Sequence, residues 1–291
     1  VATYTTNATV SFDDALSNQV AWYRIGVKTG NYTSGTVVLD LGYAIGSVDG
    51  IVRIQDYGYD WISRTSAADN DWFAIAWAPS LSLFAAVSNT GVGNRVMTSP
   101  DGITWTSRTS AADNSWVGIA WAPSLSLFAA VAQSGVGNRV MTSSDGITWT
   151  ARTSAADNNW FAIAWSPDLG IFTVTSQLGT GNRVMTSADG ITWVGRTSAA
   201  DNSWYGIAWS PQLSLFAAVS ATGTGNRVMT SPDGITWTAR TSAVDNPWVS
   251  ITWAPSLSLF AAVSYSGAGN RVMTSPDGIT WTARTSAVDN Q

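Results

Sequence analysis

Short runs of apolar residues, each separated from the next by turn residues, are the clearest pattern in the middle of the chain. The runs cover residues 116–121, 127–131, 139–142 and 147–152. Their side chains follow a period of two and include many β-branched and aromatic residues, which favours strands over helices. Residues 144–146, Ser-Asp-Gly, are typical of a tight turn between two strands. The pattern predicts a four-stranded antiparallel meander.

This pattern returns with a period of 44 residues. The segment Arg-Thr-Ser-Ala begins at Arg64, Arg108, Arg152, Arg196, Arg240 and Arg284. Three tryptophan series keep the same step: Trp61, Trp105, Trp149, Trp193, Trp237 and Trp281; Trp72, Trp116, Trp160, Trp204 and Trp248; and Trp77, Trp121, Trp165, Trp209 and Trp253. Such a period indicates units that bury their apolar faces against neighbouring units.

Four short strands per unit predict an all-β fold, a five-bladed β-propeller of 44-residue blades that covers residues 55–291. Small residues such as Gly118 and Ala120 occupy the first strand of the unit. We expect this strand to be the innermost strand of the blade, because a bulky side chain would clash near the central channel of the propeller.

The turn before the fourth strand has a recurring sequence. It reads Ser-Pro-Asp-Gly-Ile-Thr-Trp at residues 99–105, and copies begin at Ser143, Ser187, Ser231 and Ser275. It resembles the Asp-box, Ser-x-Asp-x-Gly-x-Thr-Trp, with one residue fewer between Asp and Gly. The resemblance implies that the carboxylate anchors the turn and that the tryptophan packs into the blade. The blade number and tryptophan content also resemble tachylectin-type sugar-binding propellers.

The fourth strand occurs once more often than the other three, because a copy around Trp61 precedes the first full unit. We expect the strand of residues 59–64 to complete the last blade and so close the ring. Alternatively, the copy at residues 279–284 takes that place. A six-bladed ring is a further alternative, in which residues 1–54 supply three strands of a divergent blade.

Residues 1–54 carry none of the landmarks of the repeat and predict a separate small β-rich module. They resemble β-rich segments of phage tail and fibre proteins. This resemblance implies a role in attachment or oligomerisation, with other structural proteins of the same assembly as partners.

Composition removes several classes of function. The chain has no Cys, no His and no Glu, so thiol nucleophiles, Ser-His pairs and nitrogen- or sulfur-ligated metal sites are excluded, and we expect no cofactor and no metal. The net charge of -5 disfavours binding to nucleic acid. Apolar runs are too short for a membrane helix, so we expect no membrane insertion. No signal peptide is visible at the first residues.

One edge of each blade contains both the turn after the second strand, whose sequence varies between copies, and the Asp-Asn-x-Trp crossover. We expect binding there. The candidate aromatic residues are Trp72, Trp116, Trp160, Trp204 and Trp248, and the candidate polar residues are Asp69, Asn70, Asp113, Asn114, Asp157, Asn158, Asp201, Asn202, Asp245 and Asn246. Alternatively, the Asp-Asn pairs cap the crossover and the tip variation is drift without function.

The sequence therefore predicts a non-enzymatic, multivalent propeller that binds a glycan or a cell-surface receptor, as a recognition module of a phage or microbial surface structure. Its expected location is extracellular or on a virion surface. The alternative is a purely structural or protein-interacting decoration propeller. A sialidase-like hydrolase is disfavoured because no Glu is present to activate a tyrosine.

Overall fold

A computed structural model describes residues 62–289 of the chain. The expected β-rich module of residues 1–54 lies outside the described residues, as does Trp61. Residues 63–289 belong to one compact unit. It contains five sheets, and each has four antiparallel strands in sequence order. The prediction of an all-β, five-bladed propeller with a repeat of about 44 residues is thereby confirmed.

The blades are bounded alike. The innermost strands are β1 (Trp72–Ala78), β5 (Trp116–Ala122), β9 (Trp160–Ser166), β13 (Trp204–Ser210) and β17 (Trp248–Ala254). The second strands are β2 (Leu83–Ser88), β6 (Leu127–Ala132), β10 (Ile171–Ser176), β14 (Leu215–Ser220) and β18 (Leu259–Ser264). The third strands are β3 (Val96–Ser99), β7 (Val140–Ser143), β11 (Val184–Ser187), β15 (Val228–Ser231) and β19 (Val272–Ser275). The outer strands are β4 (Thr106–Arg108), β8 (Thr150–Arg152), β12 (Val194–Arg196), β16 (Thr238–Arg240) and β20 (Thr282–Arg284). A 3-10 turn, η1 (Pro79–Leu81), joins β1 to β2.

Apolar cores fill the joints between neighbouring blades. In the first joint, Val87 and Val96 of the first blade share a buried cluster with Ile119 and Trp121 of the second. The three following joints repeat this packing. Each blade is therefore stabilised mainly by the faces that it buries against its neighbours.

The turn between the third and fourth strands is held by its aspartate. Oδ1 of Asp145 accepts hydrogen bonds from the backbone N–H groups of Ile147 and Thr148 at 2.8 and 2.7 Å. Gly146 has a φ of +72°, which glycine adopts without strain. The indole of Trp149 is buried and donates to the carbonyl of Gly146 at 3.0 Å. The aspartate is the turn anchor, and the fourth-strand tryptophan the core residue, that the sequence predicts.

The small residues of the innermost strands face a neighbouring blade. A Cβ atom added to Gly118 would lie 2.6 Å from the backbone oxygen of Phe161, in the innermost strand of the next blade. At Gly206 the added atom would lie 3.2 Å from the backbone of Ser250. Close approach of adjacent innermost strands therefore accounts for both glycines.

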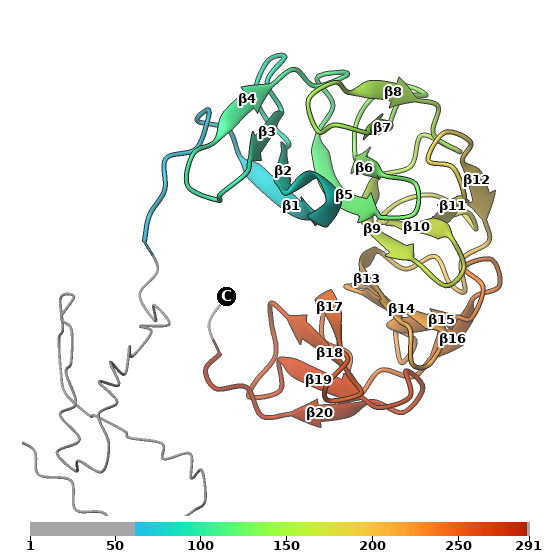
Figure 1. Cartoon of the computed structure of the whole chain (residues 1–291). Helices are drawn as coiled ribbons and strands as arrows, with labels where there is room; N and C mark the ends of the chain where they lie inside the picture. Colours follow the sequence, from blue (N-terminus) through green and yellow to red (C-terminus); the bar gives the residue numbers. More distant parts are fainter. Residues whose placement is uncertain (1–61, 290–291) are drawn as a thin grey trace, which may run out of the picture. The chain divides into compact units, whose positions relative to one another are not determined.

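The described residues do not form the closed ring that we expected. Strand β20 pairs with β19 and completes the last blade, while residues 62–64 belong to no strand. The prediction that the segment around Trp61 provides this strand is therefore wrong. The reason is local: β20 follows β19 through a tight turn, so its pairing requires no closure between distant parts of the chain. Figure 1 shows the five blades as an arc with an opening between β1 and β17.

The helical content of residues 62–289 is confined to short turns. None of these described residues belongs to a helix that is long and apolar enough to cross a membrane.

Candidate binding surface at the inner rim

One edge of every blade combines the turn after the second strand with the crossover that leads into the first strand. The backbone N–H of Gln133 donates to the carbonyl of Ser115 at 3.0 Å, and that of Gln177 donates to the carbonyl of Asn159 at 3.0 Å. In the first blade, Asn89 makes the same bond to Asp71 at 3.2 Å. These bonds confirm that the variable turns and the Asp-Asn crossovers share one edge.

A bulge in each innermost strand turns one residue away from the ladder. In the second blade Trp116 pairs with Ala132 and Gly118 with Val131, so the residue between them is left without a partner in the register. The other four innermost strands have the same bulge. The bulged residues are Phe73, Val117, Phe161, Tyr205 and Val249.

Three bulged aromatic residues meet at the centre of the arc. The rings of Phe73 and Phe161 lie edge to face with centroids 5.5 Å apart, and those of Phe161 and Tyr205 lie 4.8 Å apart. Phe73 and Phe161 belong to the first and third blades, so their contact requires both side chains to point inward. Phe73 is 49% exposed.

The variable turns at the same edge of the blades contribute amide side chains, and the turn at Gln177 bonds to Asn159, two residues before Phe161. Nε2 of Gln133 donates to Oε1 of Gln177 at 3.0 Å and links the second and third blades. In the fifth blade the equivalent turn presents Tyr265, which is 52% exposed. We call Phe73, Phe161, Tyr205, Gln133, Gln177 and Tyr265 the inner rim.

The predicted aromatic series does not form part of this open surface. Trp116, Trp160, Trp204 and Trp248 are fully buried, and Trp72 is half-buried. Nε1 of Trp116 donates to the carbonyl of Ala112 at 2.9 Å, within the crossover. Stacking on a sugar needs an open ring face, which these four candidate binding residues do not offer in the structure. Their size and apolar character instead fill the joint between blades.

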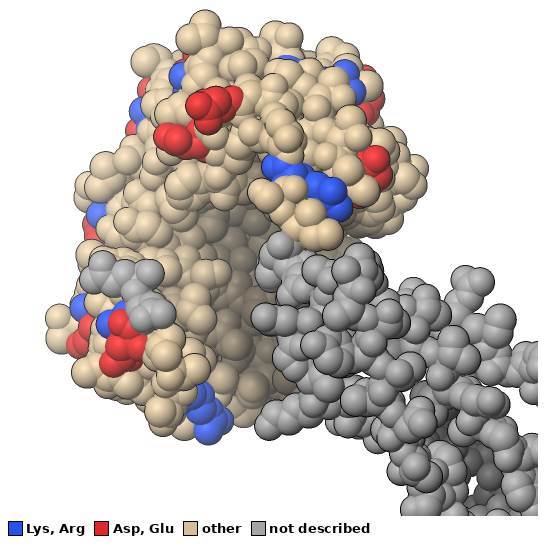
Figure 2. Space-filling view, turned by 90° about the vertical axis from the view of Figure 1, so that its left-hand side faces the viewer, with Lys and Arg blue, Asp and Glu red and all other residues tan. Residues whose placement is uncertain are grey.

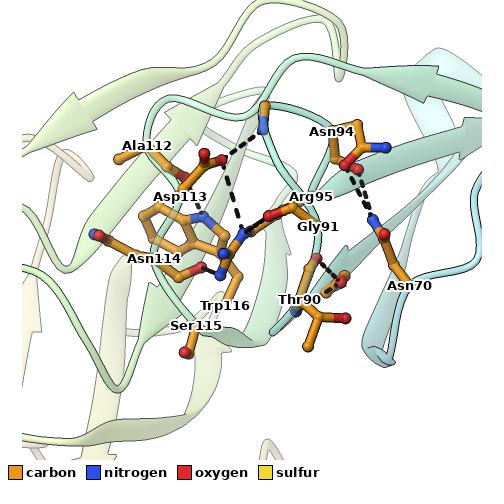
Figure 3. A network of polar contacts seen from close by, with 12 residues as sticks. Asn70, Thr90, Gly91, Asn94, Arg95, Ala112, Asp113, Asn114, Ser115 and Trp116 are labelled. Atoms are coloured by element: carbon orange, nitrogen blue, oxygen red, sulfur yellow. Dashed lines mark hydrogen bonds and ion pairs between the residues drawn. The ribbon is translucent and has the colours of Figure 1, made fainter.

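The Asp-Asn pairs tie the crossover to the blades, as the capping alternative predicts. Oδ1 of Asp113 accepts from the backbone N–H of Gly93 in the preceding blade at 2.6 Å and lies 3.7 Å from Nε of Arg95. Nδ2 of Asn114 donates to the carbonyl of Asn138 in its own blade at 2.8 Å. Figure 3 shows Asp113 and Arg95 of this network beside the buried Trp116 ring.

The same contacts recur along the repeat. The aspartates that pair with the preceding blade are Asp113, Asp157, Asp201, Asp245 and Asp289. The asparagines that bond within their own blade are Asn70, Asn114, Asn158, Asn202 and Asn246. Among the predicted polar residues, Asp69 alone has no partner within residues 62–289.

The carboxylates within residues 62–289 serve mainly structural roles and are poorly suited to metal binding or acid catalysis. No group of three or more acidic residues within residues 62–289 could hold a metal ion. Hydrogen bonds from the backbone N–H groups of Thr104 and Ile103 lower the pKa of Asp101. The bond from Thr192 likewise lowers the pKa of Asp189. A general acid needs the opposite shift.

The bulged aromatic residues escaped the sequence analysis, although a signal was present. Positions 73, 117, 161, 205 and 249 read Phe, Val, Phe, Tyr and Val, and this position changes size in a strand whose neighbouring tryptophan and isoleucine positions do not vary. Variation at one position of an otherwise constant strand is typical of a residue that faces a ligand or solvent. The bulge that takes this position out of the ladder follows from backbone geometry, which the residue pattern does not reveal.

No family model and no curated protein sequence matches this chain. Its similarity to known proteins lies in the fold. The chain is similar to the GH74 enzyme of Niastella koreensis with a TM-score of 0.60 and 18% identity, over 74% of this chain and 38% of the enzyme chain. It thus spans well under half the length of that enzyme chain.

Two further solved structures have a similar fold. A gluconolactonase of Xanthomonas campestris matches with a TM-score of 0.53 and 14% identity, over 75% of this chain and 77% of the gluconolactonase. A chain of a nidogen/laminin complex matches with a TM-score of 0.51 and 14% identity, over 76% and 87% of the two chains. Identities this low support a propeller fold and leave the function open.

Proposed function

We propose that the protein is a non-enzymatic propeller that binds carbohydrate, and that its inner rim recognises a glycan receptor on a cell or microbial surface. One observation carries the proposal: the inner rim combines an aromatic cluster with amide side chains that come from the same edge of two neighbouring blades. Phe73, Phe161 and Tyr205 provide the rings, and Gln133 and Gln177 provide the amides.

This combination suits the chemistry of a sugar. A pyranose has apolar C–H faces that stack on aromatic rings and hydroxyl groups that exchange hydrogen bonds with amides. The bulges and the turns that present these side chains are held by strands of a rigid blade, which reduces the entropic cost of binding. The inner rim contains no Lys, Arg or Asp, so a neutral glycan is the best fit.

The rim also changes the expected number of sites. The expectation of a multivalent chain rested on the repeated tryptophans, and the structure fully buries four of these five residues. The bulged residues differ between blades, so together they form one composite site. We therefore propose one glycan per chain, with avidity arising only if several chains assemble.

The absence of catalysis is part of the proposal. Glycoside hydrolysis needs a carboxylic acid that stays protonated near neutral pH and a second group that acts as base or nucleophile. The chain has no Glu and no His, and the turn aspartates have lowered pKa values. On the evidence of the sequence alone, we further propose that residues 1–54 attach the protein to other structural proteins. The proposed location is an extracellular or virion surface.

Retention of the purified full chain on a glycan array tests this function. We expect the parent to bind a set of neutral glycans and Tyr205→Ala to lose at least about tenfold in affinity for the same set, because stacking and its hydrogen bond are lost together. Ile103→Ala is the matched control, since Ile103 is 52% exposed on the opposite edge of the first blade. If the parent binds no glycan, the proposed function is wrong and the structural or protein-interacting alternative replaces it.

A further inference from the structure

A groove of about 420 Å³ lies between the third and fourth blades. The third blade contributes residues of β10, β11 and β12 and of the turns beside them, and the fourth blade contributes the turn before β16. The residues that line it include Leu169, Ile171, Asp189, Val194, Asp233 and Ile235, which we call the outer groove. Leu169, Val194 and Ile235 are 39%, 45% and 47% exposed. Several large apolar side chains are thus uncovered here within the described part of the chain.

The third blade departs from the repeat around this groove. Val194 begins β12, whereas the other four outer strands begin with threonine, and Ile171 begins β10, whereas the other second strands begin with leucine. Thr173 occupies a position that is alanine in the other four blades. Its buried Oγ1 has no hydrogen-bond partner within residues 62–289 and lies 3.0 Å from the place that a Cβ atom of Gly234 would take, next to Asp233. Because the other four blades fold without these residues, the differences indicate a role that the third blade alone performs.

Two ionised carboxylates also line the outer groove. Oδ1 of Asp189 accepts a hydrogen bond from the backbone N–H of Thr192 at 2.7 Å, and this bond lowers the pKa of Asp189. Burial raises the pKa of Asp233, but bonds from the backbone N–H groups of Thr236 and Ile235 lower it overall. Both groups are therefore negatively charged at neutral pH.

The charge balance of the outer groove is negative. Arg196 also lines the groove, and its Nε donates to Oγ1 of Thr186 at 2.9 Å. One arginine therefore stands against the two carboxylates of Asp189 and Asp233. Charged residues make up only 11% of the chain, and Figure 2 shows them in small groups between wide uncharged areas. A cationic group on an apolar stem, as in lysine and arginine, matches a groove that is both apolar and negatively charged.

Strand β12 offers a partner an open edge. It is the outermost strand of its sheet, pairs with β11, and has no described strand on its other side. Gly195, in its middle, replaces the serine or alanine of the other blades. Packing does not require this glycine, because the nearest atom to an added Cβ would lie 3.9 Å away. A glycine in an edge strand instead permits the close approach of another backbone.

We propose that β12 and the outer groove bind an extended segment of a partner protein. The segment pairs with the open edge of β12 as an added strand. Alternate side chains of such a segment face the same side as Val194 and Arg196, so they enter the groove. One of them is an aliphatic side chain that covers Val194, and another is a lysine or arginine whose charge lies beside Asp189 and Asp233. This site is separate from the inner rim and does not depend on glycan binding.

Immobilised peptides provide the probe. Nonapeptides in which the central residue and the residues two positions to either side are varied are presented to the full chain. We expect the retained peptides to have Lys or Arg at one of these positions and Val, Ile or Leu at the next. Replacing the cation by Glu should weaken binding at least about tenfold. No retention of any peptide, or equal retention of the Glu peptides, would overturn the proposal.

Two pairs of variants locate the site on the protein. Val194→Thr restores the residue of the other blades and should weaken binding at least about threefold, whereas Val136→Thr, at a turn position that is 88% exposed, should leave binding unchanged. Asp233→Asn should weaken binding at least about tenfold, and Asp277→Asn should not. The second pair is matched for folding, because both aspartates accept a turn bond of 2.8 Å from an isoleucine N–H. Losses of equal size within either pair would place the peptide elsewhere and contradict the proposal.

A second copy of the chain is the competing occupant of the outer groove. Sedimentation velocity of the full chain over a range of concentrations separates the two occupants. We expect Val194→Thr to leave the sedimentation profile of the full chain unchanged. Self-association that Val194→Thr abolishes and Val136→Thr retains would assign the groove to a second copy, against the proposal.

Discussion

The carboxylate of Asp113 accepts a hydrogen bond of 2.6 Å from the backbone N–H of Gly93, and this contact joins two blades. Asp113 precedes the second blade, whereas Gly93 belongs to a turn of the first. The bond therefore fixes the crossover that positions the innermost strand. Asp113→Ala should lower the free energy of unfolding by about 1–2 kcal/mol, because the N–H loses its partner. Urea denaturation measures the effect.

Asp71→Ala is the control, because Asp71 is exposed and its carboxylate does not make this contact; this variant should change the stability little. Equal losses of stability in the two variants would mean that the Asp113–Gly93 bond does not stabilise the joint between the blades.

The buried tryptophans of the crossover should behave as core residues. Trp116→Ala should cost about 3–5 kcal/mol in unfolding free energy, because it removes a fully buried ring from a joint between blades. Trp149→Ala, in the same joint, should cost a similar amount. Denaturant midpoints of both variants test this. A Trp116→Ala variant with parental stability would mean that the ring is more open in solution than in the structure.

Two glycines provide a matched test of how closely the blades approach. Gly118→Ala should destabilise by about 1–3 kcal/mol, since its Cβ would lie 2.6 Å from the oxygen of Phe161. Gly195→Ala should be neutral or slightly stabilising, because the nearest atom to its Cβ lies 3.9 Å away. Thermal unfolding compares them. The account of innermost packing fails if Gly118→Ala is the better tolerated of the two.

An indole donor in the third blade has no acceptor, and the repeat itself suggests one. Nε1 of Trp209 donates to Oδ2 of Asp168 at 2.9 Å. The equivalent Nε1 of Trp165 is buried and has no hydrogen-bond partner within residues 62–289, and Ser124 occupies the place of Asp168. Ser124→Asp should therefore stabilise the protein by about 1 kcal/mol, whereas Ser124→Ala should not. Equal melting temperatures for the two variants would show that the donor is satisfied in solution.

Stability should fall in acid and stay level near neutrality. The turn aspartates such as Asp101 have pKa values below the ordinary 3.8, because backbone N–H groups of the turn bind the carboxylate. Their stabilisation is present above the unfolded-state pKa and is lost as the pH falls through the lower, folded-state pKa. The chain has no His to titrate between about pH 5 and 8. Denaturation midpoints measured across pH 2–8 should be flat above about pH 5 and drop below about pH 4; a step near pH 6.5 would contradict this.

The repeat predicted the blades well because each blade is formed by residues that are close together in the sequence. Strand order, the aspartate turn of Asp145 and the buried position of Trp149 follow from residues close together in the chain. The sequence did not reveal that Trp116 is buried, because its burial depends on the face of the neighbouring blade. The contact of Phe73 with Phe161 joins the first blade to the third, and no short-range pattern contains that information.

Ring closure was misjudged for a similar reason. Two copies of the fourth strand competed for one place, and their sequences are nearly equivalent in the residues that pair. Proximity along the chain decided in favour of β20, since a short turn costs less entropy than a closure across the whole ring. In the described part of the chain, the outward faces of the first and fifth blades therefore stay apart.

Calorimetric titration of the full chain with a neutral glycan that it retains on an array tests the central claim most directly. The account predicts one site per chain, parental affinity for Ile103→Ala, and a loss of at least about tenfold for Gln177→Ala and Tyr205→Ala at unchanged melting temperature. Five equivalent sites per chain, or full affinity in both inner-rim variants, would contradict it.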